Sequence, residues 1–346
     1  MTKRWRKAQR VLIENRGLGS LRSQLNASYA ATGQAEKLAA QSIGRLFDKE
    51  IPALSRQVSG FTAIHGDYAT AKKFGRLDAF YKELDKSIKG LHKAERALID
   101  KQRLAVFKSA YADNAQAWGD SLGITFGGPN RASLAAFEEM PVLGLPLQQQ
   151  TQAQALQMAS VVRRQITIGL ITGENPRTVA RRIQRVAGIA KRHAETLART
   201  SIISAHGQAE MIFSERNKDI FKPNTFRWYT AADERTCDIC APLHGQIIEN
   251  PEHPAHFRCR CSITPVMRKE LQTIADKYTK ESRMRMAAQR KELISPEGTA
   301  KRAAFRREQT NAAARLRYAR DRRAEGLTVR PLKKKDGSPT QWAKTA

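Results

Sequence analysis

The sequence has few acidic residues and no long apolar run. It contains 33 Asp and Glu against 61 Lys and Arg in 346 residues, which gives a formal net charge of +28. Such an excess indicates a polyanionic partner or a setting that tolerates repulsion. No window reaches 18 consecutive apolar residues, and the basic start at residues 3–7 is followed by only a short apolar run at residues 11–13. We therefore expect neither a membrane-spanning helix nor a secretory signal peptide.

Several catalytic signatures are also missing. The chain has no P-loop, no Gly-x-Ser-x-Gly nucleophile elbow and no dinucleotide-binding fingerprint. Cysteine is confined to a window of 25 residues, where it occupies four positions: Cys237, Cys240, Cys259 and Cys261. In a chain without a secretion signal, this clustering favours a metal site over disulfides.

Apolar residues at helical spacing dominate the first third of the chain. The stretch 35–58 has this spacing, with Pro52 as an interruption, and the stretch 77–91 carries a cleaner stripe. The stripe consists of Leu77, Phe80, Tyr81, Leu84, Ile88 and Leu91. We interpret residues 1–122 as a helical docking region, whose stripe forms core or a surface for a partner helix.

The middle of the chain alternates between loop and helix signals. Residues 123–153 are rich in Gly and Pro and predict a linker with a short element inside it. A helix is expected from about residue 154 to Gly173, a second from the Asn175–Pro176 capping pair, and a third over residues 190–217.

A change of character follows at Thr225. Three short β-prone runs, 225–229, 245–248 and 262–267, predict a small antiparallel sheet. Residues 268–346 are predicted to form a basic helical tail, because they hold 22 Lys and Arg against 9 Asp and Glu, an excess of 13 positive charges. The stretch 332–339 reads as an exposed end of that tail. The predicted fold is mainly α with a small α+β module at residues 154–267.

The cysteines and one histidine have the spacing of a metal knuckle. Cys237 and Cys240 form a Cys-x2-Cys step, and a loop later come His256, Cys259 and Cys261. Zinc prefers four tetrahedral thiolate or imidazole ligands, and a two-residue gap lets one turn present two of them. The most natural set of ligands is Cys237, Cys240, His256 and Cys259. Cys261 is the leading substitute, and His253 is a more distant one.

The sequence leaves open a site of three cysteines and one histidine or a site of four cysteines. Two further alternatives are buried cysteines without metal and a disulfide pair. A closed four-ligand site would be structural, since no position is left for water or substrate. Its zinc would hold together a segment too small to bury its own core.

Two neighbouring features have simple structural interpretations. His244 is read as a turn residue ahead of a strand, with a general base as the alternative. Asp233 is read as stabilising a turn in which it pairs with Arg235, with a second metal site as the alternative. His193 and His206, 13 residues apart on a helix, have no obvious partner.

The order of these motifs resembles the phage head morphogenesis domain, the family that includes the minor head proteins of Mu-like and related tailed phages. The resemblance spans roughly residues 155–267. It is carried by Ala198–Thr200, by Trp228–Cys240, by Leu243–Gly245, by His256–Cys261 and by Pro265 with Val266. The family's His-Pro step occurs here as His253–Pro254, which keeps His253 open as an alternative to His256.

The resemblance implies a low-copy, non-enzymatic structural protein of a phage or prophage head, close to the portal vertex and packaged with the genome. Its expected partners are the portal protein, the major capsid protein as a second candidate, and double-stranded DNA bound without sequence preference. Its expected location is the inside of the virion head, after assembly from the host cytoplasm. The charge points independently to DNA, since Lys and Arg neutralise phosphates.

Two other functions are weighed against this one. A zinc-stapled nuclease of the His-Asn-His type shares the Cys-x2-Cys step and scattered histidines, but it needs further ligands for a catalytic ion, and no histidine follows His256. A host DNA-binding regulator ranks last, because no helix-turn-helix is evident and the positive charge is dispersed.

Overall fold

The computed structural model describes residues 3–4, 6–8, 18–269, 271 and 280–324. The fold is mainly helical with one small antiparallel sheet, as the sequence predicts. The longer helices are α2 (Leu18–Ile64), α4 (Arg76–Leu122), α6 (Leu147–Ile171) and α7 (Pro176–Arg216). The short helical segments are α3 (Tyr68–Lys72), η1 (Lys73–Gly75), α5 (Arg131–Glu139) and η2 (Ala241–Leu243).

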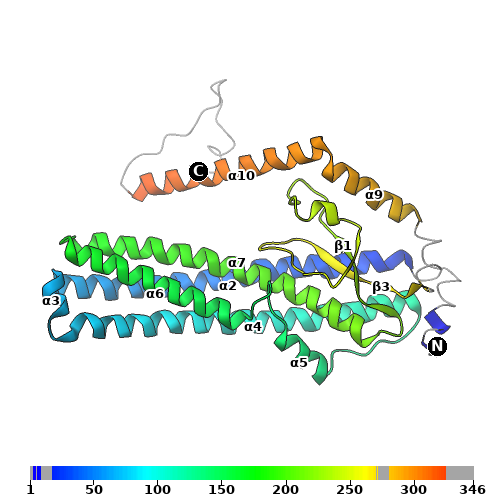
Figure 1. The fold of residues 1–346 in the computed structure, drawn as a ribbon, viewed down its shortest axis with the longest axis horizontal. Helices are drawn as coiled ribbons and strands as arrows, with labels where there is room; N and C mark the ends of the chain where they lie inside the picture. The colour runs from blue at the N-terminus through cyan, green and yellow to red at the C-terminus, as the bar shows by residue number, and fades with distance from the viewer. Residues whose placement is uncertain (1–2, 5, 9–17, 270, 272–279, 325–346) are drawn as a thin grey trace.

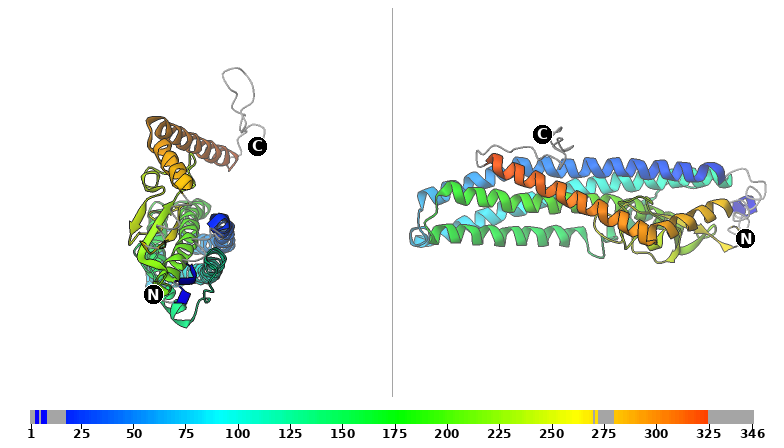
Figure 2. Two further views of the ribbon diagram at one scale, coloured as in Figure 1. Left: turned by 90° about the vertical axis from the view of Figure 1, so that its right-hand side faces the viewer. Right: turned by 90° about the horizontal axis from the view of Figure 1, so that it is seen from above.

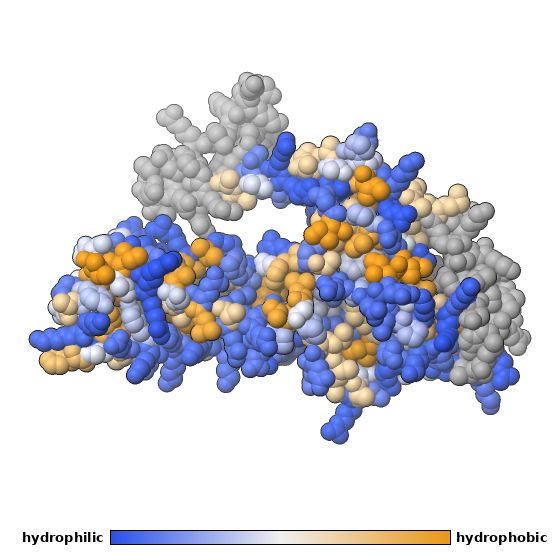
Figure 3. Space-filling view, viewed as in Figure 1, coloured by the Kyte–Doolittle hydropathy of each residue, from blue (hydrophilic) through white to orange (hydrophobic). Residues whose placement is uncertain are grey.

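The four long helices form an elongated bundle. Helix α2 packs on α7 and α4, and α4 packs on α7 and α6. Figures 1 and 2 show these helices running along one common axis, with the sheet beside the end of α7. In the space-filling view, hydrophilic residues cover most of the bundle surface, with smaller hydrophobic patches between them (Figure 3).

Two apolar clusters fill the bundle, and each combines residues from before and after the 123–153 segment. One includes Phe47, Phe107 and Phe213, and the other includes Leu84, Val162 and Ile183. The apolar stripe predicted at residues 77–91 contributes to both, mostly through Leu84, Ile88 and Leu91. The stripe is therefore core between helices of this chain.

Two expected helix breaks do not occur. Helix α2 continues through Pro52, and α7 is one helix over the region where the sequence predicted two, 175 onward and 190–217. A proline inside a helix costs about 3 kcal/mol, but Phe47 and Leu54 on either side of Pro52 are both buried. Packing of the flanking turns thus outweighs the local signal, and the same holds around Gly188, between buried Ala187 and Ala194.

The 123–153 segment folds against the bundle. It contains α5, capped by the Asn130 side chain, which accepts a hydrogen bond from the Ser133 amide. Its Ile124, Phe126 and Phe137 are buried in the same cluster as Phe107. Helix α6 then begins at Leu147, earlier than the predicted residue 154, and α7 begins at Pro176 as its capping pair predicts, with Asn175 bonded to the Arg177 amide.

The sheet is confirmed at all three predicted runs. Strands β1 (Phe221–Tyr229), β2 (Ile247–Glu249) and β3 (Ser262–Met267) pair antiparallel in the order β2-β1-β3. Phe226 lies opposite Ile248 on one side and Pro265 on the other. A third, small cluster under the sheet comprises Phe226, Trp228, Cys240, Cys259, Cys261 and Ile263.

The basic tail is helical where it is described. Helices α9 (Lys280–Ile294) and α10 (Pro296–Ala324) form an arm, in which α9 packs on η2 and α10 extends back over the bundle (Figure 1). The predicted exposed end at 332–339 lies outside the described residues. None of the described helices combines the length and apolar character needed to cross a bilayer.

Candidate metal centre

The Cys-x2-Cys step forms a tight turn ahead of η2. The Cys240 amide donates to the Cys237 carbonyl at 3.2 Å and lies 3.4 Å from the Cys237 sulfur. The turn aims both sulfur atoms at the loop that follows β2. Cys240 is buried and Cys237 is half-buried, so the pair sits at the edge of the small cluster under the sheet.

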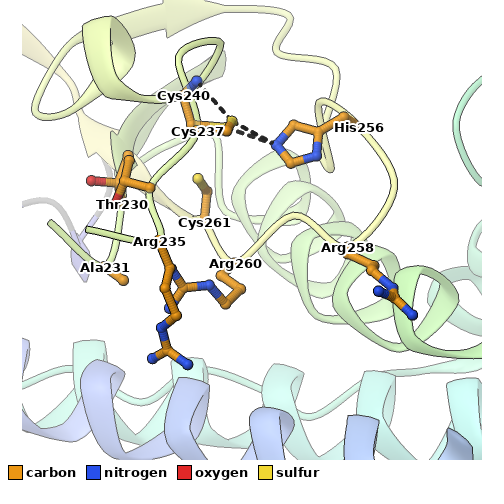
Figure 4. A pocket seen from close by; sticks show the side chains of 10 residues that line it. Thr230, Ala231, Arg235, Cys237, Cys240, His256, Arg258, Arg260 and Cys261 are labelled. Carbon is orange, nitrogen blue, oxygen red and sulfur yellow. Dashed lines mark hydrogen bonds between the residues drawn. The ribbon is translucent and has the colours of Figure 1, made fainter. Parts of the chain in front are cut away.

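His256 completes one group of potential ligands. Its Nε2 lies 3.0 Å from the Cys237 sulfur and 3.2 Å from the Cys240 sulfur (Figure 4). Its Nδ1 lies 2.8 Å from the Phe257 carbonyl, which can only accept, so the ring proton sits on Nδ1 and Nε2 presents its lone pair to the sulfurs. This is the tautomer that binds a metal.

Cys259 and Cys261 form a second group with Cys240. The ligand atoms within each group lie within 4.8 Å of one another, and Cys240 belongs to both. The Cys240 and Cys259 sulfurs are 3.8 Å apart, and all four cysteines are free, so no disulfide is present. The disulfide alternative is therefore wrong.

The crowded sulfurs perturb each other's protonation. A hydrogen bond between the two side chains raises the pKa of Cys240 and lowers that of Cys259. Hydrogen bonding to Cys259, together with burial, also raises the pKa of Cys261. Three buried sulfurs thus compete to carry negative charge, and a bound cation removes this competition because it favours thiolate at every ligand.

The spacing fits a zinc-type ion. Sulfur ligands at ~2.3 Å in a tetrahedron lie about 3.8 Å apart, which equals the Cys240–Cys259 separation. Sulfur and nitrogen ligands would lie about 3.6 Å apart, slightly more than the 3.0 and 3.2 Å observed around His256. Cys237, Cys240, His256, Cys259 and Cys261 therefore could hold a metal ion; which four would do so stays a prediction.

The predicted turn at Asp233 is present, and Asp233 pairs with Arg260 in addition to the expected Arg235. Asp233 accepts from the Arg235 amide at 3.1 Å and pairs with its guanidinium at 3.3 Å. Arg260, between Cys259 and Cys261, donates to both Asp233 oxygens at 3.0 and 2.7 Å. This pairing lowers the pKa of Asp233 to about 2. It ties the two halves of the cysteine motif together.

A hydrogen bond joins the cysteine motif to the bundle. The buried Thr200 side chain on α7 accepts from the Arg258 amide at 3.1 Å. Arg258 has a left-handed backbone, φ 59°, directly before Cys259. A small pocket beside the sulfurs is lined in part by Arg235, Arg258 and Arg260 (Figure 4). Sequence spacing alone gave no signal for the contacts of Thr200 or Arg260.

Ion pairs join the cysteine motif to the arm formed by α9 and α10. Asp238, inside the Cys-x2-Cys turn, pairs with Arg302 at 2.9 Å and with Arg306 at 3.0 Å, both on α10. The Arg302 side chain is only 4% exposed and also donates to the Leu293 carbonyl. Because a buried guanidinium is costly unless paired, this contact fixes the corner between α9 and α10.

The remaining histidines have structural surroundings. His253 is buried, contacts the Cys261 carbonyl at 2.8 Å and stands edge-on to Trp228, and neither metal-capable group includes it. The Nδ1 of His244 accepts from the Thr230 amide at 3.1 Å, and burial lowers its pKa. His206 is buried against Tyr29, and burial lowers its pKa to about 3.

Comparison with known proteins yields one match. Residues 160–264 match the family described as "Phage Mu protein F like protein". This segment begins within α6 and ends within β3, so it contains α7, the sheet's first two strands and all five potential ligands. No curated protein and no solved structure matches the chain.

Proposed function

We propose that the protein is a minor structural component of a tailed phage or prophage head, on the premise that residues 160–264 match the phage Mu protein F-like family and resemble a head morphogenesis domain. The observation that carries the proposal is the family match over the segment that builds the cysteine centre. Thr200, Asp233 and Arg260, which hold the motif together, all lie inside it.

We further propose that the protein lies inside the head near the portal vertex, after assembly in the host cytoplasm. The portal protein is the first proposed partner, and the major capsid protein is a second. The elongated bundle supports this role, because it presents a long and mostly hydrophilic surface for docking (Figure 3).

Double-stranded DNA is the third proposed partner. The net charge of +28 supports contact with phosphates, and such contact is independent of sequence and strongly salt dependent. A protein enclosed with a packaged genome meets DNA at high concentration, so it needs no base-specific readout.

Zinc is the proposed resident ion, with a structural role. Cys237, Cys240, Cys259 and His256 are the proposed ligands, and Cys261 is the substitute for His256. Thiolates and a neutral imidazole are donors that zinc prefers. When bound, the ion neutralises the buried sulfurs and draws the two halves of the motif together.

A structural function is favoured over a nuclease. A catalytic divalent ion needs ligands and an open position, and within the described residues both metal-capable groups belong to the cysteine centre. His244 is only 2% exposed and is bonded to Thr230. Burial lowers the pKa of His244, which among the described residues is further affected by Gln289, Arg22 and Arg290 and by no carboxylate.

The test is mass spectrometry of purified DNA-filled particles compared with empty procapsids. We expect the protein as a low-copy component of the filled particles, and its absence from them contradicts the proposal. A plasmid nicking assay with magnesium or manganese completes the test. Protein-dependent cleavage that His244→Ala abolishes would establish the nuclease instead.

A further inference from the structure

The amino-terminal half of α7 carries positive charge without any negative charge. Residues 176–193 contain six Lys and Arg and no Asp or Glu. One face of this half-helix packs into the bundle through Val179, Ile183 and Ala187, which are fully buried. The basic side chains must therefore occupy the remaining faces.

Four of these cations form a row, which we call the arginine stripe: Arg177, Arg181, Arg185 and Arg192. They are spaced by four, four and seven residues, which places them on one side of a helix. All four are exposed. At 1.5 Å per residue the stripe extends over roughly 22 Å along the helix.

The acids near this end of the bundle are already engaged by other cations. Glu174 pairs with Arg182 at 2.9 Å, Asp48 pairs with Lys191 at 2.7 Å, and Asp85 pairs with Arg163. No guanidinium of the arginine stripe has a carboxylate partner within the part of the chain that the structure describes. Four like charges thus stand in a row without internal neutralisation.

We propose that the arginine stripe is a contact surface for the phosphate backbone of duplex DNA. This inference rests on the proposed function, in which the protein contacts packaged DNA, and it places one such contact on the Mu F-like domain as well as on the basic tail. A duplex is a linear array of like charges, and guanidinium groups bind phosphate in a bidentate manner. A protein partner fits less well, because it would need apolar anchors and a matching row of carboxylates, whereas every duplex presents a row of phosphates.

The test compares two fourfold variants in the salt dependence of duplex DNA binding by the full chain. One is Arg177→Gln, Arg181→Gln, Arg185→Gln and Arg192→Gln. The matched control is Lys82→Gln, Lys86→Gln, Lys89→Gln and Lys93→Gln, which removes the same charge from exposed positions on α4. Circular dichroism establishes that both variants keep the helical content of the wild type.

Each phosphate contact contributes about 0.9 to the slope of log affinity against log salt. We therefore expect the stripe variant to lower the slope by about 3 to 4, and the α4 control to lower it by less than about 1. If the wild type binds DNA and the two variants give equal slopes, the proposal for the arginine stripe is wrong and the proposed function stands. A wild type that binds no DNA even at low salt overturns both.

Discussion

The helical bundle buries long apolar stripes, whereas the sheet module buries a cluster of six residues, of which three are cysteines. In the bundle, aromatic side chains pack in continuous contact, as where Phe107 stacks on Phe137 with ring centroids 4.3 Å apart. In the module, Cys240, Cys259 and Cys261 take the positions that larger apolar residues would fill in an ordinary core. The module therefore has little apolar area of its own to oppose the entropy of the unfolded chain.

The difference teaches that the two regions depend on different interactions. The bundle is stabilised by the hydrophobic effect over many residues, so its stability does not depend on one site alone. The module is held by the cysteine centre, by three polar contacts at Thr200, Asp233 and Asp238, and by Phe221 and Met267, which pack at its edge into an apolar cluster of the bundle. A perturbation of the centre should therefore affect the sheet and the arm and leave the bundle folded.

The largest expected effect comes from Cys240→Ser, because Cys240 belongs to both metal-capable groups. We expect loss of bound zinc and loss of amide protection in β1, β2 and β3, with protection in α2 and α4 retained. Hydrogen–deuterium exchange with elemental analysis measures both. Ile239→Ala, at a 60% exposed position in the same turn, is the control and should keep the ion. Stoichiometric zinc in Cys240→Ser would contradict the comparison.

The second effect tests the bundle. Phe107→Ala removes a fully buried ring between α4 and its neighbours, so it should cost about 3–5 kcal/mol of unfolding free energy and leave zinc content unchanged. Chemical denaturation measures the free energy. Phe74→Ala removes an 81% exposed ring and should change it by less than about 0.5 kcal/mol. Loss of zinc in Phe107→Ala would show that the two regions are not separable.

A third effect is expected on α7 and depends on pH. Burial raises the pKa of Glu210 on α7 from 4.5 to about 8. Between these values the unfolded chain has released a proton that the folded chain keeps, so stability falls as pH rises. Glu210→Gln stays neutral, and its melting temperature should exceed that of the wild type by a margin that grows from pH 5 to pH 9. The exposed Glu215→Gln should show no such trend; a constant margin for Glu210→Gln would contradict the burial effect.

Local signals predicted much of this fold. The Asn175–Pro176 pair marks the start of α7 because a capping side chain and a fixed φ act within one turn. The three strands were predicted because β-branched and aromatic residues cluster there. The predicted interruption at Pro52 and the predicted division of α7 into two helices were wrong, since burial on both sides of each position decides whether a helix continues.

The ligand residues of the cysteine centre were predictable from the sequence, but the distant residues that position them were not. The spacing of Cys237, Cys240, His256, Cys259 and Cys261 indicated convergence, and the structure brings them together. The Asp233–Arg235 pair was predicted, but the distant partners of Asp238 and Asp233 were not predictable, because Arg302 and Arg260 lie 64 and 27 residues further along the chain. Such pairs depend on the final arrangement of elements, which no local pattern encodes.

Elemental analysis of natively purified wild-type protein, combined with thiol titration before and after chelation, tests the central claim most directly. We predict one zinc ion per chain, with ligand thiols that react only after the ion is removed. A folded chain that contains no metal and has four freely reactive thiols would contradict the account.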